Sequence, residues 1–174
     1  MTELEKEIKD WAVSIVVALV LAFFIRTFIV EPYLVDGPSM RPTLENGERL
    51  LVNRFVYRVR APEKNEIIVF AYPKDPSRDF IKRVIATPGD TIEIQDTKVF
   101  VNDKLLDEPY ILEKTHTNYP KTVVPAGTVF VMGDNRNNSA DSRLASVGFV
   151  PYDLLKGKAV LVFWPFDQFK SLDG

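Results

Sequence analysis

The chain has 174 residues, 46% of them hydrophobic and 26% charged, a composition that excludes both a disordered chain and a protein lying wholly within a membrane. The net charge of −2, without a basic stripe, argues against a nucleic acid partner. The absence of cysteine excludes a disulfide framework and a thiol nucleophile, and the single histidine, His116, excludes a cluster of histidine ligands.

A nearly continuous apolar run, WAVSIVVALVLAFFIRTFIV, extends from Trp11 to Val30. Only Ser14, Arg26 and Thr27 interrupt it. As an α-helix the run would be roughly 30 Å long, which is the thickness of the hydrocarbon core of a bilayer. We therefore predict a transmembrane helix over residues 11–31, with residues 1–10 as a short tail.

Two alternatives apply to this apolar run. A helix buried in a protein core would have a one-sided polar pattern, which the run lacks. A cleavable signal peptide would have a shorter apolar stretch before a small-residue site, whereas FIVEPY follows here. Positive charge leaves the orientation open, because Lys6 and Lys9 precede the run and Arg41 and Arg49 follow it.

After Pro32 the pattern changes to short apolar runs separated by turn residues, which is typical of antiparallel sheets. The pair Asp96-Thr97 fits a two-residue hairpin loop. We predict a mainly β domain over residues 32–174, built as two packed sheets or a distorted barrel. The expected strands are Arg49–Tyr57, Glu66–Tyr72, Phe80–Ala86, Thr91–Gln95, Lys98–Asn102, Thr128–Gly133 and Lys158–Trp164.

The first chemical candidate is Ser39, in the stretch VDGPSMRPTL. Gly37 permits backbone angles closed to other residues, while Pro38 and Pro42 each fix a φ angle. The backbone around Ser39 is therefore expected to be stiff, as the attacking group of a hydrolase must be. Taken alone, such a serine is more often an ordinary turn residue.

A serine nucleophile needs a base. His116 lies in a polar stretch without a carboxylate pattern, so a solvated loop histidine is its default interpretation. Strand alternation places Lys82 on one face with Phe80 and Val84, where burial would lower the pKa of its amine and let it act as a base. The alternative is that Lys82, or its neighbour Arg83, guards the edge of a sheet.

The third candidate is the polar loop MGDNRNNSADSR, Met132 to Arg143, which follows an expected strand. It does not fit a calcium-binding EF-hand, since Ser139 stands at the position of the required glycine. It is either a solvated surface loop or a fixed polar network, in which a hydroxyl can orient a neutral lysine. Its charged residues alternate in sign: Asp134, Arg136, Asp141 and Arg143.

Taken together, GPSMRPTL, FIKRVIATPGD and MGDNRNNSADSR resemble the motif set of bacterial type I signal peptidases. Their order, after an apolar amino-terminal run, is that of the compact Gram-positive type. The resemblance implies a serine endopeptidase in which Ser39 is the nucleophile and Lys82 the general base. It further implies that cleavage passes through an acyl-enzyme and that neither a metal nor an organic cofactor takes part.

The resemblance also assigns supporting residues. It implies that Ser139 orients Lys82 and that Asp134 pairs with Arg83. Gly37 stands where larger relatives have a serine that donates to the oxyanion, which leaves the second oxyanion donor unassigned. The other residues that match the supporting loop are Arg136, Asp141 and Arg143.

The substrates implied by the resemblance are the signal peptides of exported proteins, with small residues at the cleavage site. The implied location is the cell membrane, with residues 1–10 cytoplasmic and the β domain extracytoplasmic. The oligomeric state is not indicated.

Two other functions are compatible with the same residues. A self-cleaving Ser-Lys repressor shares the dyad chemistry, although such proteins have a soluble or DNA-binding arm in place of an apolar run. A catalytically inactive, membrane-tethered β module that binds exported chains is the other alternative.

Overall fold

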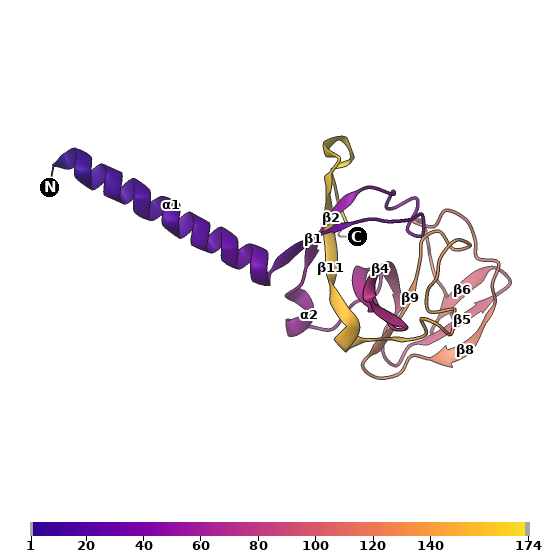
Figure 1. The fold of residues 1–174 in the computed structure, drawn as a ribbon. Helices are drawn as coiled ribbons and strands as arrows, with labels where there is room; N and C mark the ends of the chain where they lie inside the picture. The colour runs from indigo at the N-terminus through magenta and orange to yellow at the C-terminus, as the bar shows by residue number, and fades with distance from the viewer. Residues whose placement is uncertain (1, 173–174) are drawn as a thin grey trace.

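The computed structural model describes residues 2–172, without the side chains of Glu5 and of residues 24–28. A long amino-terminal helix, α1 (Glu3–Phe28), projects from a β domain (Figure 1). Its described side chains are exposed, from Trp11 at 71% to Phe23 at 69%. The helix is therefore not a buried core helix.

The apolar run ends in a strand. Val30 and Glu31, expected at the end of the helix, belong instead to β1 (Val30–Leu34). Pairing with β2 (Arg49–Asn53) draws them into the sheet, and the backbone N–H of Arg54 donates to the carbonyl of Ile29 at 2.8 Å. Within residues 2–172, less the side chains left undescribed, no helix is long and apolar enough to cross a membrane.

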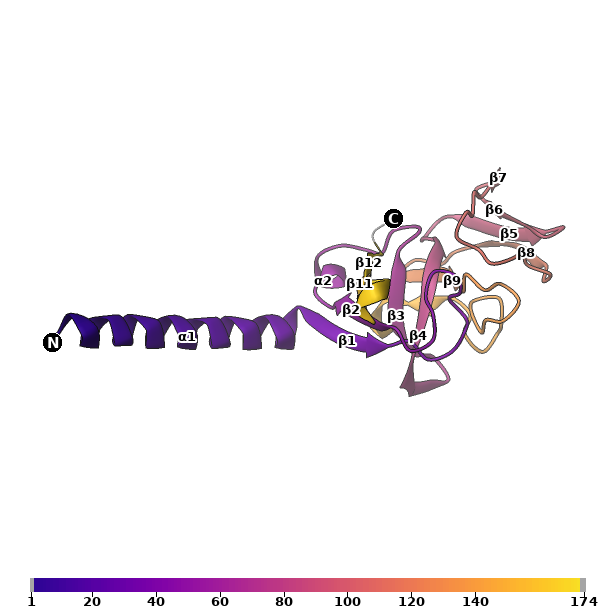
Figure 2. The same cartoon turned by 90° about the horizontal axis from the view of Figure 1, so that it is seen from above.

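The domain consists of two antiparallel sheets, which confirms the expected mainly β fold (Figures 1 and 2). The larger sheet has the order β1-β2-β11-β3-β4-β9-β10, with β12 paired to β11. The smaller has the order β7-β6-β5-β8. The remaining bounds are β3 Ile67–Tyr72, β4 Asp75–Ala86, β5 Thr91–Gln95, β6 Lys98–Val101, β7 Lys104–Leu105, β8 Tyr119–Val123, β9 Thr128–Met132, β10 Val150–Pro151, β11 Leu155–Trp164, β12 Lys170–Ser171, α2 Val56–Val59, η1 Tyr152–Leu154 and η2 Phe166–Gln168.

The smaller sheet contains the expected hairpin. Asp96 and Thr97 both have positive φ, 51° and 67°, and join the paired ends of β5 and β6. Such angles match the twist of a two-residue hairpin. The two sheets pack together because Ile92 and Ile94 of β5 share a core cluster with Phe130 of β9.

The expected strand Arg49–Tyr57 is wrong in its last part. The side chain of Asn53 accepts hydrogen bonds from the backbone N–H groups of Phe55 and Val56 at 2.9 and 3.1 Å, which turns the chain into α2. Strands β1 and β8 were not expected, since Pro32 and Pro120 interrupt their patterns. Both are outer strands of their sheets, where a missing N–H is tolerated.

Strand β4 carries the two basic candidates. Phe80 and Val84 pack in one core cluster, whereas Ile81 packs against another, so successive side chains point to opposite faces as expected. Lys82 is 4% exposed and Arg83 is 6% exposed. Neither guards a solvated sheet edge, and that interpretation is wrong.

Candidate active site

Ser39 lies in a tight connection after β1 that is fastened at both ends. The N–H of Val35 donates to the carbonyl of Glu48 at 2.8 Å, and the N–H of Gly37 donates to the side chain of Asn46 at 2.8 Å. Gly37 has a φ of +100°, which only glycine adopts without strain. Met40, 1% exposed, anchors the turn in the core next to Ser39.

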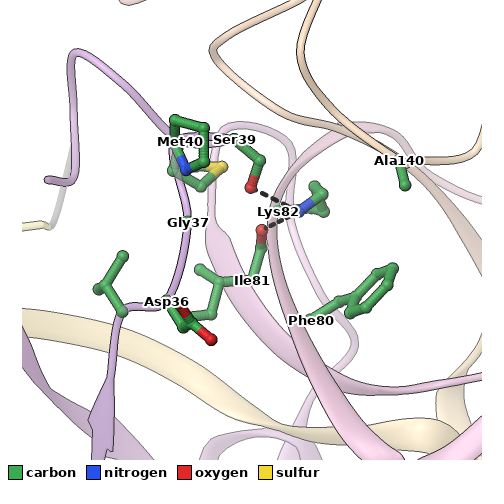
Figure 3. A pocket seen from close by; sticks show the side chains of 10 residues that line it. Asp36, Gly37, Ser39, Met40, Phe80, Ile81, Lys82 and Ala140 are labelled. Carbon is green, nitrogen blue, oxygen red and sulfur yellow. Dashed lines mark hydrogen bonds between the residues drawn. The ribbon is translucent and has the colours of Figure 1, made fainter. Parts of the chain in front are cut away.

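The connection brings Ser39 against Lys82, 43 residues further along the chain (Figure 3). The Lys82 Nζ lies 2.9 Å from the Ser39 Oγ and 2.7 Å from the carbonyl oxygen of Ile81. Figure 3 shows the amine and the hydroxyl pointing toward each other, with Ala140 on the side of Lys82 away from Ser39. This is the separation at which a base can take a proton directly.

Burial lowers the pKa of the Lys82 amine to about 8, although the charges of Asp141 and Asp134 act in the opposite direction. The ring of Phe80, with its centroid 5.2 Å from Nζ, forms part of the apolar surroundings. A substantial fraction of Lys82 is therefore neutral in mildly alkaline solution, which an ordinary lysine is not.

A cavity of about 190 Å³ opens beside the two groups. One wall is the connection from Val35 to Met40, another is the segment from Phe80 to Lys82, and Ala140 closes a third side. Apart from Asp36, Ser39 and Lys82, the wall side chains are apolar or absent. The space suits a small side chain next to the Ser39 hydroxyl.

The polar loop from Gly133 to Arg143 clamps the Ser39 turn. The N–H of Asn135 donates to the Ser39 carbonyl at 3.1 Å, and the Asn135 side chain donates to the Pro38 carbonyl at 3.2 Å. Gly133 permits this approach, since a Cβ there would lie 2.4 Å from the Ser39 carbonyl oxygen. Asn135 was not expected, because its partners are distant backbone atoms that leave no pattern in the sequence.

The ion pair expected between Arg83 and Asp134 is present. Arg83 donates through Nε at 2.9 Å and through Nη2 at 2.7 Å, so the contact is bidentate. Thr43, four residues after Ser39, donates its hydroxyl to the same carboxylate at 2.5 Å. Asp134 is fully buried, and these contacts compensate its charge.

The second carboxylate of the loop, Asp141, fixes the loop internally. It accepts hydrogen bonds from the Gly133 N–H at 3.0 Å and from two guanidinium nitrogens of Arg143 at 2.8 Å each. Arg143 also donates to the backbone carbonyl of Arg136 at 2.6 Å. Arg136 itself is 1% exposed and pairs with Glu108. The loop is a fixed polar network and not a solvated surface loop.

Ser139 differs from the expectation. Its hydroxyl is buried but has no hydrogen-bond partner within the described part of the chain, and the polar contacts of the Lys82 amine are with Ser39 and Ile81. The orienting hydrogen bond to Lys82 is therefore not formed. The Ser139 side chain lies close to Gly133, since a Cβ there would be 2.3 Å from its hydroxyl oxygen. His116 lies apart from the dyad cavity, in a different cavity with Ser139.

The family model described as signal peptidase, peptidase S26, matches residues 8–164. The chain belongs to this family. It is 38% identical over 185 residues to Signal peptidase IB of Staphylococcus aureus (strain COL), covering 96% of this chain and 95% of that protein. It is 43% identical over 172 residues to the protein named Probable signal peptidase I-1 of Synechocystis sp., covering 95% and 87%.

A solved structure is also similar. The crystal structure of a signal peptidase I from Enterococcus faecalis V583 matches with a TM-score of 0.52 and 29% sequence identity, covering 59% of this chain and 99% of that one. The family match begins at residue 8 and so includes most of α1. A self-cleaving repressor would not account for this apolar helix. Family membership identifies the chain as a peptidase and decides against that alternative.

The lowered pKa of Lys82 predicts a stability effect. The unfolded chain, with an ordinary lysine, binds more protons than the folded chain between about pH 8 and pH 10.5, so the cost of burying Lys82 is full below pH 8 and fades above it. We expect Lys82→Met to raise the free energy of unfolding at pH 7 by ~1–3 kcal/mol, an advantage that shrinks toward pH 10.

Urea unfolding followed by circular dichroism between pH 7 and pH 10 measures this difference. Lys98→Met, at an exposed position of β6, is the matched control and should show no pH-dependent advantage. A Lys82→Met advantage that is absent at pH 7, or constant with pH, contradicts the prediction.

Proposed function

We propose that this chain is a membrane-bound serine endopeptidase that removes amino-terminal signal peptides from exported proteins by means of a Ser39–Lys82 dyad. The observation that carries the proposal is the 2.9 Å contact between the Lys82 amine and the Ser39 hydroxyl beside a small cavity. Membership in the signal peptidase family supports the substrate class.

In the first half of the reaction, the neutral Lys82 amine takes the Ser39 proton while the Ser39 oxygen attacks the scissile carbonyl carbon. The backbone N–H of Ser39 is available to the oxyanion that forms, whereas Gly37 brings no hydroxyl to it. The protonated Lys82 then gives its proton to the departing amine. The carbon–nitrogen bond breaks, leaving an ester between the signal peptide and Ser39.

In the second half, Lys82 is neutral again and takes a proton from a water molecule, which attacks the ester carbonyl. The Ser39 oxygen leaves and receives that proton from Lys82, and the signal peptide departs with a free carboxylate. Both halves need Lys82 neutral at their start, so the burial that lowers its pKa is part of the mechanism. Asn135 and the Asp134–Arg83 pair hold the Ser39 turn in position beside Lys82.

The cavity is consistent with the small residues that precede a signal peptide cleavage site. Strand β4 pairs with β9 only from Arg83 onward. The edge of its Phe80–Lys82 part that faces away from β3 therefore has no strand partner among residues 2–172. An extended substrate can lie along this free edge and direct alternate side chains into the cavity.

The membrane part of the proposal rests on exposed apolar residues. The α1 side chains from Trp11 to Phe23 have no protein cover that would keep them from water. Leu34 and Trp164 both pair with Arg49 across the sheet and are 61% and 44% exposed. We propose that α1 is the anchor, because the apolar run of the sequence continues through residues 24–28, whose side chains lie outside those described. In this proposal residues 1–10 are cytoplasmic and the domain after β1 is extracytoplasmic.

Replacing Ser39 or Lys82 by alanine, separately, is expected to lower cleavage of a preprotein by at least about 10³-fold. Cleavage is followed with the full chain in detergent or vesicles. Lys98→Ala, at an exposed position of β6 outside the cavity, is the control and should keep the activity. Undiminished cleavage by either the Ser39 or the Lys82 variant contradicts the mechanism. If Ser39 of the wild-type chain does not react with an acylating inhibitor, the inactive binding module is favoured instead.

The rate of cleavage is expected to rise with pH through a single ionisation near pH 8, because only the neutral form of Lys82 accepts the Ser39 proton. Single-turnover rates at saturating substrate between pH 5 and pH 10 test this dependence. An acidic limb near pH 4–5, as an ordinary carboxylate would give, would rule out Lys82 as the base.

The anchor makes a separate prediction. The full chain is expected to stay in the membrane fraction after alkaline carbonate extraction, whereas a chain lacking residues 2–28 is released. Ser39→Ala in the full chain is the control and should stay with the membrane. Release of the full chain would contradict the anchor while leaving the dyad proposal intact.

A further inference from the structure

We propose that Tyr110 is a positioning residue for the dyad, acting through Arg83. The inference rests on the proposed Ser39–Lys82 mechanism. Tyr110 lies in the connection between β7 and β8, in the smaller sheet's part of the chain. The sequence patterns gave no sign of this residue.

The contact between Tyr110 and Arg83 is made by the ring. The guanidinium carbon of Arg83 lies 4.0 Å from the centroid of the Tyr110 ring. The Tyr110 hydroxyl is buried and has no hydrogen-bond partner among residues 2–172 with described side chains. A cation–π contact with a largely desolvated arginine is of the strong kind. The hydroxyl does not contribute to it.

The edges of the Arg83 guanidinium are already occupied. Nε and Nη2 donate to Asp134, and Nη1 donates to the carbonyl of Asn65 at 2.9 Å. The flat face of the group makes no hydrogen bonds, and Tyr110 packs against it. Because the edges fix the direction of the group and the ring fixes its plane, Tyr110 sets where the Asp134 carboxylate is held.

Asp134 transmits this placement to the nucleophile. It accepts the Thr43 hydroxyl, and its chain neighbour Asn135 binds the carbonyls of Ser39 and Pro38. Tyr110 is therefore linked by three contacts, through Arg83 and Asp134, to Thr43, four residues after Ser39. A shift of Asp134 moves Ser39 relative to Lys82, and a proton transfer between them is sensitive to such a shift.

Tyr110 does not touch the dyad cavity. With Arg83 and Thr43 it lines a separate cavity of about 440 Å³ on the other face of β4. A Tyr110 variant should therefore change the rate of the chemical step and leave substrate binding unchanged.

Other contacts keep the Tyr110 connection in place when its ring is removed. The N–H of Leu112 donates to the carbonyl of Asp134 at 3.2 Å, and Asn137 donates to the carbonyl of Lys114 at 3.0 Å. Arg143 donates to the Thr115 hydroxyl at 2.8 Å. A substitution at Tyr110 is thus expected to release Arg83 without detaching the connection.

The test compares Tyr110→Phe with Tyr110→Leu in the full chain, by preprotein cleavage well below the melting temperature of each variant. We expect Tyr110→Phe to keep kcat within about twofold, because it keeps the ring, and Tyr110→Leu to lower kcat about five- to tenfold with KM unchanged. Tyr110→Met is the second variant if Tyr110→Leu does not fold, with the same expected loss. The matched control is Tyr119→Leu, at a residue of β8 whose ring packs on Phe130 of β9, and it should lower the melting temperature with kcat unchanged.

The inference is overturned if Tyr110→Leu or Tyr110→Met keeps the wild-type kcat, if Tyr110→Phe loses as much as they do, or if Tyr119→Leu lowers kcat equally. The inference is supported if Tyr110→Phe keeps the wild-type kcat while Tyr110→Leu or Tyr110→Met loses it. Failure of the underlying mechanism is seen separately, since Ser39→Ala and Lys82→Ala would then still cleave.

Discussion

The hydrogen bond between the Lys82 amine and the Ser39 hydroxyl is the interaction on which the rest of the site depends. The proposed proton transfer across this hydrogen bond requires that water be excluded, because a solvated lysine stays charged at neutral pH and cannot accept a proton. The neighbouring Phe80 ring and the buried surroundings of β4 supply that exclusion. The same burial costs stability, which the packed core clusters on both faces of β4 must offset.

Desolvation alone does not place the serine. Ser39 comes from the connection after β1, and Lys82 from a strand whose neighbours are β3 and β9. The loop after β9 joins the two, with Asn135 on the Ser39 carbonyl and Asp134 on Arg83. Arg83 and Lys82 are adjacent and point to opposite faces, so one strand positions both the proposed base and the arginine that pairs with Asp134.

Much of the fold and of the candidate site could be predicted from local sequence patterns. The alternation in FIKRVIA placed Lys82 on an apolar face, and the resemblance assigned the Arg83–Asp134 pair that the structure contains. Strands that contain proline escaped prediction because their pattern is broken, although pairing at a sheet edge tolerates it. Asn135 and Tyr110 were not predicted because their partners are far away in sequence. Asn135 binds the backbone carbonyl of Ser39, and Tyr110 packs against the Arg83 guanidinium. Ser139 shows the converse, a matched motif residue whose expected hydrogen bond is not formed.

Whether Lys82 can serve as a neutral base is decided by measuring the pKa of its amine. In the full chain labelled with ¹³C at the lysine Cε, the Lys82 signal can be assigned by its loss in Lys82→Ala and followed by NMR from pH 6 to pH 11. We expect a midpoint near 8, well below the midpoints of the exposed lysines. If Lys82 titrates at the same midpoint as the exposed lysines, near the ordinary value of about 10.4, it cannot be a neutral base at physiological pH.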